Sequence, residues 1–132
     1  ATKLKNSLKS VKHSFVDLGE DEFTVGRPHP MIDFSLRNKR ILEEAAYPET
    51  AVVLLDVVLG YGSNMDPVGE LAPVVKKAAR KVSVVCSVTG TDADPQNRSA
   101  VVKALEATGA IVMPSNAAAC RLAGEIVKGL ER

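Results

Sequence analysis

Residues 51–58 limit the folds open to this chain more than any other segment, because they read Ala-Val-Val-Leu-Leu-Asp-Val-Val. Such a near-continuous apolar run, rich in β-branched residues, is typical of a strand that is buried on both faces of a parallel sheet. A second apolar run follows at 82–88, after a stretch long enough to hold a helix. The chain is therefore expected to build a parallel α/β sheet.

Two weaker segments complete the expected sheet. Residues 14–18 alternate between apolar and polar side chains, residues 22–25 extend that strand or form an edge strand, and residues 109–113 form the last strand. Each expected helix begins at a residue that favours helix starts; the expected helices are 33–46, 66–79, 94–108 and 115–130. Strands that alternate with helices indicate βαβ crossovers. We predict a small doubly wound α/β domain of flavodoxin-like type, with about four parallel strands flanked by helices.

The composition agrees with one folded domain. The 132 residues are 45% hydrophobic and 25% charged, which is ordinary for a globular chain of this length. Residues 1–13 are expected to form a short helix or a frayed arm. The net charge of +1 and the aromatic content of 4% speak against a nucleic-acid partner. The apolar runs are shorter than the roughly 18 residues of a membrane span, so no membrane partner is expected.

The two cysteines point to a reducing compartment. Cys86 and Cys120 both have small or apolar neighbours, and we expect two buried thiols in a cytoplasmic protein. No Cys/His spacing indicates a metal site.

Polar residues follow each expected strand, where ligands bind in sheets of this kind. The first loop, 26–33, contains Gly26 and Arg27, and it places His29 between two prolines. Arg27 is suited to pair with a carboxylate or phosphate, and His29 is suited to acid–base chemistry near neutral pH. The alternative is a rigid turn in which His29 only satisfies backbone groups.

The second loop follows residues 51–58. Gly60 and Gly62 allow the backbone to approach a phosphate, with Ser63 and Asn64 beside them, or they form only a tight turn. Asp56 interrupts the apolar run, and a carboxylate there needs a partner or a place in the cleft.

The third loop, 89–98, carries Thr91, Asp92 and Asp94. Its carboxylates are suited to bind a cation or to act as acid–base groups. The alternative is that Asp94 caps the next helix and Asp92 is solvated.

Several strings resemble FdrA-type proteins over nearly the whole chain. They are Phe-Val-Asp-Leu-Gly-Glu-Asp-Glu-Phe-Thr-Val-Gly-Arg-Pro-His-Pro-Met-Ile-Asp (15–33), Ser-Leu-Arg-Asn-Lys-Arg-Ile (35–41), Leu-Leu-Asp-Val-Val-Leu-Gly-Tyr-Gly-Ser-Asn (54–64) and Thr-Gly-Thr-Asp-Ala-Asp-Pro-Gln (89–96). FdrA-type proteins are similar to the alpha subunit of succinyl-CoA synthetase and to other ADP- or GDP-forming acyl-CoA synthetases. The resemblance implies that residues 1–132 are one flavodoxin-like ligase-type domain, a piece of a longer protein without its CoA-binding domain.

The resemblance also implies where the chain departs from the wider family. The phosphohistidine of that family belongs to the loop at 89–98, which contains no His. Asp56 falls near the family's acidic residue beside the phosphohistidine, and His29 lies at the same expected sheet edge. CoA and nucleotide are expected only with other domains or subunits, so no cofactor is expected in this domain.

The loop residues and the family resemblance together suggest three alternative functions. The first is a ligase-type domain that binds a carboxylate or acyl-phosphate-like substrate at the strand carboxyl ends, through Asp56, His29 and the loop residues above. The second is a domain of a carbamoyltransferase subunit in purine-nitrogen (oxamate) catabolism. The third is a degenerate assembly domain whose partners are the other domains of the full-length protein or a second subunit.

Overall fold

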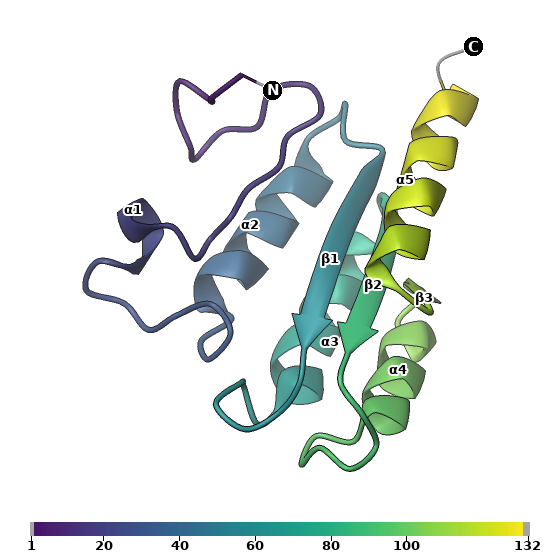
Figure 1. The fold of residues 1–132 in the computed structure, drawn as a ribbon. Helices are drawn as coiled ribbons and strands as arrows, with labels where there is room; N and C mark the ends of the chain where they lie inside the picture. The colour runs from purple at the N-terminus through teal and green to yellow at the C-terminus, as the bar shows by residue number, and fades with distance from the viewer. Residues whose placement is uncertain (1, 131–132) are drawn as a thin grey trace.

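A computed structural model describes residues 2–130 as a three-stranded parallel sheet with helices on both faces (Figure 1). The strands are β1 (Val52–Val58), β2 (Ser83–Thr89) and β3 (Ile111–Met113). The helices are α1 (Asp21–Thr24), α2 (Ser35–Ala46), α3 (Pro67–Ala78), α4 (Arg98–Ala107) and α5 (Asn116–Leu130). The α/β class with a parallel sheet is thereby confirmed.

The sheet has the order β1-β2-β3, so each strand lies beside the next one along the chain. Because α3 and α4 both connect neighbouring parallel strands in the same direction, they lie on one face of the sheet, where α2 joins them by packing against α3. Helix α5 packs on the opposite face, across β1 and β2. The carboxyl ends of all three strands therefore open toward the same edge.

The core lies between the sheet and the layer of α2, α3 and α4. Its members are Phe34, Ile41, Ala45, Leu55, Val57, Leu59, Leu71, Val75, Ala78, Val84, Cys86, Val88, Val101, Leu105 and Ala110. The face under α5 is smaller and contains the buried side chains of Val85 and Ala119. Central strand β2 is buried on both faces, as its sequence indicated.

Edge strand β1 is not buried on both faces, which corrects the expectation from its composition. On the face toward α5, Leu54 is 40% exposed and Asp56 is exposed, whereas Leu55 and Val57 are buried. Composition alone does not distinguish a central strand from an apolar strand at the edge of a sheet.

The expected fourth strand is absent from residues 2–130, and this expectation was wrong. Residues 14–18 pair with no strand, and the expected extension at 22–25 is occupied by the single turn of α1. A strand needs a neighbour for its backbone groups, and residues 14–18 have none in this structure. The expected short helix within 1–13 does not form in the described part of that arm either.

The arm before α1 is held against α2 by side chains. Arg40 donates hydrogen bonds to the Ser7 carbonyl at 2.9 Å and to Ser10 Oγ at 2.9 Å. Glu44 accepts from Arg40 Nε at 2.7 Å and also from Ser10.

No helix within residues 2–130 combines the length and apolar character needed to cross a membrane.

Candidate functional site

A row of polar side chains crosses the sheet near its carboxyl edge, on the face covered by α5. Asp56 on β1 lies opposite Ser87 on β2, and Ser87 Oγ donates to Asp56 Oδ1 at 3.0 Å. Asn116 Nδ2, at the first residue of α5, lies 3.5 Å from Ser87 Oγ. Ser87 is 1% exposed, whereas Asp56 and Asn116 are exposed. The row therefore has a buried centre and two ends that solvent or a ligand can reach.

The N-terminus of α5 adds backbone donors to this row. Ser115 Oγ accepts from the Ala118 amide at 3.1 Å and so uses one of the free amides of the first turn. At the N-terminus of a helix the first amides lack partners within the helix, and the helix dipole favours a negative group there. Cys120, one turn further, contacts Asn116 Oδ1 at 3.6 Å.

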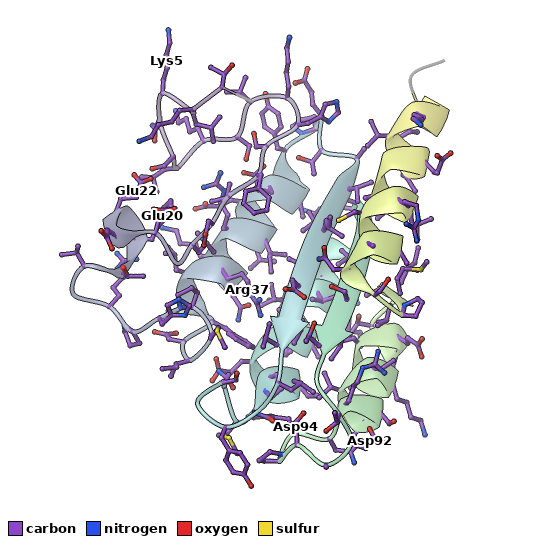
Figure 2. All side chains as sticks on the ribbon, viewed as in Figure 1. Lys5, Glu20, Glu22, Arg37, Asp92 and Asp94 are labelled. Carbon is purple, nitrogen blue, oxygen red and sulfur yellow. The ribbon has the colours of Figure 1, made fainter. Side chains whose placement is uncertain are left out.

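Arg37 of α2 reaches the same strand from its outer edge (Figure 2). Its Nη1 donates to the Asp56 carbonyl at 2.8 Å, and the guanidinium carbon lies 4.2 Å from the centre of the Phe34 ring. Its Nε and Nη2 are buried without a partner among the described residues. Burial lowers the pKa of Arg37, although the nearby Cys86 and Asp56 oppose that shift.

The loops at the strand ends are joined to one another through Asn64 and Gln96. The Asn64 amide donates to the Met31 carbonyl at 2.7 Å, and Asn64 Nδ2 donates to the Ile32 carbonyl at 2.8 Å. Gln96 accepts from the Gly60 amide at 3.0 Å and donates to the carbonyls of Gly60 and Asn64 at 2.9 and 3.0 Å. Three loops that are far apart in sequence thus form one connected rim.

Several residues that were predicted to bind a ligand instead hold the loops together or form turns. Ser63 and Asn64 are 5% and 6% exposed, so a ligand reaches neither side chain without displacing the loop. Gly60 and Gly62 have φ angles of +119° and +84°, which favour glycine and fit the alternative of a tight turn.

The two aspartates of the third loop are engaged locally and lie apart from Arg37 (Figure 2). Asp92 accepts from the Ser99 amide at 2.6 Å and from Ser99 Oγ at 2.7 Å, and these bonds lower the pKa of Asp92. Asp94 accepts from the Thr91 amide at 2.6 Å. The expected helix start at Asp94 is wrong, because Asn97 caps α4 by accepting from the Ala100 amide.

The first loop does not follow a strand, since residues 14–18 form none, but it still meets the rim through Asn64. His29 is exposed; its Nδ1 accepts from the Met31 amide at 3.2 Å, and its Nε2 lies against Gly19. Gly26, with φ +72°, and Arg27 are exposed in the same loop. No hydrogen bond links His29 to the row of Asp56, Ser87 and Asn116, so the two expected catalytic residues belong to different parts of the rim.

The two cysteines differ in burial. Cys86 is buried, and burial raises the pKa of its thiol to about 11. Cys120 is exposed, which corrects the expectation of two buried thiols: it lies on the outer side of the first turns of α5. The described residues include no group of three His, Cys, Asp or Glu side chains placed to bind a metal ion.

Sequence reasoning missed Arg37, Ser87 and Gln96. Ser87 looked like an ordinary residue of an apolar strand, and only the strand register places it opposite Asp56. A polar residue inside each of two neighbouring buried strands was the signal that could have found this pair.

Comparison with known proteins agrees with this architecture. A family model described as CoA-ligase matches residues 1–126. The protein YahF of Escherichia coli strain K12 is 40% identical over 137 aligned residues, which cover 98% of this chain and 27% of YahF. The chain thus spans about a quarter of the length of this relative.

Proposed function

Because the chain belongs to the CoA-ligase family, we propose that it is the ligase-type domain of an FdrA-type, acyl-CoA synthetase-like protein. In this proposal the domain binds a carboxylate or acyl-phosphate group at the carboxyl edge of its sheet. The observation that carries the proposal is the row of Asp56, Ser87 and Asn116, which ends at the N-terminus of α5.

The row offers donors for an anion and one carboxylate that repels it. The α5 amides and Asn116 Nδ2 are suited to receive the oxygens of a carboxylate or phosphate. Asp56 is unsuited to contact that anion directly. Its role is to hold the Ser87 hydroxyl and, as a general base, to accept a proton from the group that attacks the acyl carbon.

In this proposal the remaining predicted residues act from the loops at the same edge of the sheet. Arg27 supplies the exposed positive charge that would meet a distal phosphate, and Thr91, Gly60 and Gly62 shape the loops beside it. His29 would act only if ligand binding moves its loop toward Asp56. CoA and a nucleotide belong to other domains or subunits in this proposal.

The histidine content favours a second candidate, carbamoyl transfer. The chain has His13 and His29 and no histidine at 89–98, so we assign no phosphohistidine step to this domain. Transfer of a carbamoyl group from carbamoyl phosphate to an oxamate-like acceptor needs no phosphorylated enzyme. It would use the same anion position at α5.

A thermal-unfolding panel tests both candidates. The ligands are phosphate, carbamoyl phosphate, succinate, oxamate, CoA and ATP–Mg²⁺, and a site filled at 100 times its Kd adds about 2.7 kcal/mol of stability. Stabilisation by succinate or phosphate supports the ligase-type domain, and stabilisation by carbamoyl phosphate or oxamate supports the transferase.

Matched variants show whether the site is the one proposed. Asn116→Ala and Asp56→Asn should remove or alter the ligand-induced shift, whereas Glu106→Gln, an exposed carboxylate on α4, should leave it unchanged. A chain that responds to none of the ligands contradicts both candidates and leaves the assembly domain.

A further inference from the structure

A pocket of about 300 Å³ lies between the last turns of α2 and α3. Helix α2 ends shortly before β1 begins, and α3 ends shortly before β2 begins, so both helix ends lie at the amino edge of the parallel sheet. The arrows of β1 and β2 in Figure 1 point away from this edge. The pocket is therefore remote from the row of polar side chains at the carboxyl edge. Its lining residues are Leu42, Ala45, Lys77, Ala78, Arg80 and Lys81.

The inner wall of the pocket is apolar. Ala45 and Ala78 are 5% and 1% exposed and belong to the core, whereas Leu42 beside them is 37% exposed. Alanine at two facing positions leaves space between the helices that larger side chains would fill. Ligand pockets in proteins begin at about 300 Å³ and are lined mainly by apolar side chains with a few polar groups. The size and the lining of this pocket fit that description.

The mouth of the pocket carries three positive charges and no negative one. Lys77, Arg80 and Lys81 are exposed, and the ion pairs within residues 2–130 lie on α2 and α5 and include none of them. The chain still turns at Lys81, whose amide donates to the Ala78 carbonyl, and like charges four residues apart on a helical turn repel each other. The dipole of α3 favours a cation in its last turn, but it does not account for the apolar pocket that these cations surround.

We propose that this pocket binds a compact organic anion with an apolar body and at least two negative groups. The apolar body lies against Leu42, Ala45 and Ala78. The negative groups pair with the three cations at the mouth, and the planar guanidinium of Arg80 is suited to hold a carboxylate or phosphate through two parallel hydrogen bonds.

The dimensions favour a small molecule over a protein partner. A stable protein interface buries about 800 Å² on each partner, whereas this pocket has six lining residues. Because the pocket lies at the amino edge of the sheet, the proposal is independent of the ligase-type and carbamoyl-transfer functions.

An NMR titration of this chain with 1,3,5-benzenetricarboxylate tests the proposal, because this probe combines an apolar ring with three carboxylates. The backbone amides of Leu42, Ala45, Ala78 and Lys81 should shift and saturate, whereas the amide of Asn64 at the carboxyl edge should not. Tricarballylate has the same number of carboxylates on a short aliphatic chain. It should bind at least about 5-fold more weakly, because it lacks the apolar surface of the ring. A titration without saturation at these amides overturns the proposal.

A matched pair of charge reversals identifies the site. Lys81→Glu should weaken binding of the benzenetricarboxylate at least about 5-fold, whereas Lys103→Glu, at an exposed lysine of α4, should leave it unchanged. Both side chains are exposed, so both variants should fold. Equal effects of the two variants show general attraction to a basic surface and overturn the proposal. Tighter binding of a polyglutamate peptide at the same amides also overturns it, because the pocket then receives an acidic polypeptide instead of a small anion.

Discussion

Replacing Arg37 by methionine should leave the stability of the domain nearly unchanged, although the guanidinium is largely buried. Two of its nitrogens have no partner among the described residues, and each unpaired buried donor costs about 1–3 kcal/mol. Methionine relieves both penalties and keeps the length of the side chain in contact with Phe34.

The substitution also removes two favourable contacts. The bond from Nη1 to the Asp56 carbonyl is worth about 1.5–3 kcal/mol as a charged donor, and the contact with the Phe34 ring about 0.5–2 kcal/mol. The Asp56 carbonyl lies at the open edge, where water replaces the lost donor. Gains and losses are of similar size, so the free energy of unfolding should change by no more than about 1 kcal/mol.

Arg40→Met on the same helix is the matched control. Arg40 bonds Glu44, the Ser7 carbonyl and Ser10, and its side chain is 11% exposed. Its loss leaves Glu44 without its cation and releases the arm from α2, which should cost about 2 kcal/mol for this partly buried pair. Urea unfolding followed by circular dichroism measures both variants. If Arg37→Met costs as much as Arg40→Met, Nε and Nη2 of Arg37 have partners in solution and their burial carries no penalty.

Three further outcomes follow from the contacts described above. Burial raises the pKa of the Cys86 thiol from 9.0 to about 11, so the thiol of the unfolded chain loses its proton first as pH rises. The free energy of unfolding should therefore fall by about 2 kcal/mol between pH 9 and pH 11. Urea unfolding at each pH measures this dependence, and Cys86→Ala should flatten it. Gln96→Ala removes three hydrogen bonds between the rim loops and should lower the free energy of unfolding by about 2 kcal/mol; a change within error would show that the loops hold without it. His29→Ala should cost less than about 1 kcal/mol, because the side chain is exposed and accepts one bond from the Met31 amide; a loss of several kcal/mol in a melt would make His29 structural.

Local pattern predicted most elements of this fold correctly. Three strands and four long helices lie close to where apolar periodicity placed them, and the expected cap Asp66 accepts from the Gly69 amide before α3. The expected start of α2 at Asp33 is one residue early, because Phe34 is the N-cap and the Asp33 carboxylate accepts from the Ser35 amide. The start of α4 was misplaced because the Asp-Pro pair at 94–95 closes a turn instead, and Asn97 takes over the cap. Both residue types favour caps and turns, so sequence preference alone does not choose between them.

The candidate site was predicted only in part. Asp56 was singled out because a carboxylate inside an apolar strand needs a partner, and Ser87 is that partner. Ser87 was not singled out, although it is a polar residue inside an apolar strand, because only the strand register places it opposite Asp56. Asn64, in contrast, was predicted to bind a ligand. It is buried instead, and its side chain hydrogen-bonds the Ile32 carbonyl of another loop.

The α/β class and the places of the strands and long helices follow from local sequence pattern, because burial periodicity and capping act over a few neighbouring residues. Contacts between distant segments leave residues 14–18 unpaired and make β1 an edge strand. The same contacts bring together Arg37, Asp56, Ser87 and Asn116 from four elements. Strand pairing and side-chain convergence depend on contacts between residues far apart in the chain, and a local pattern carries no information about which distant neighbour is present.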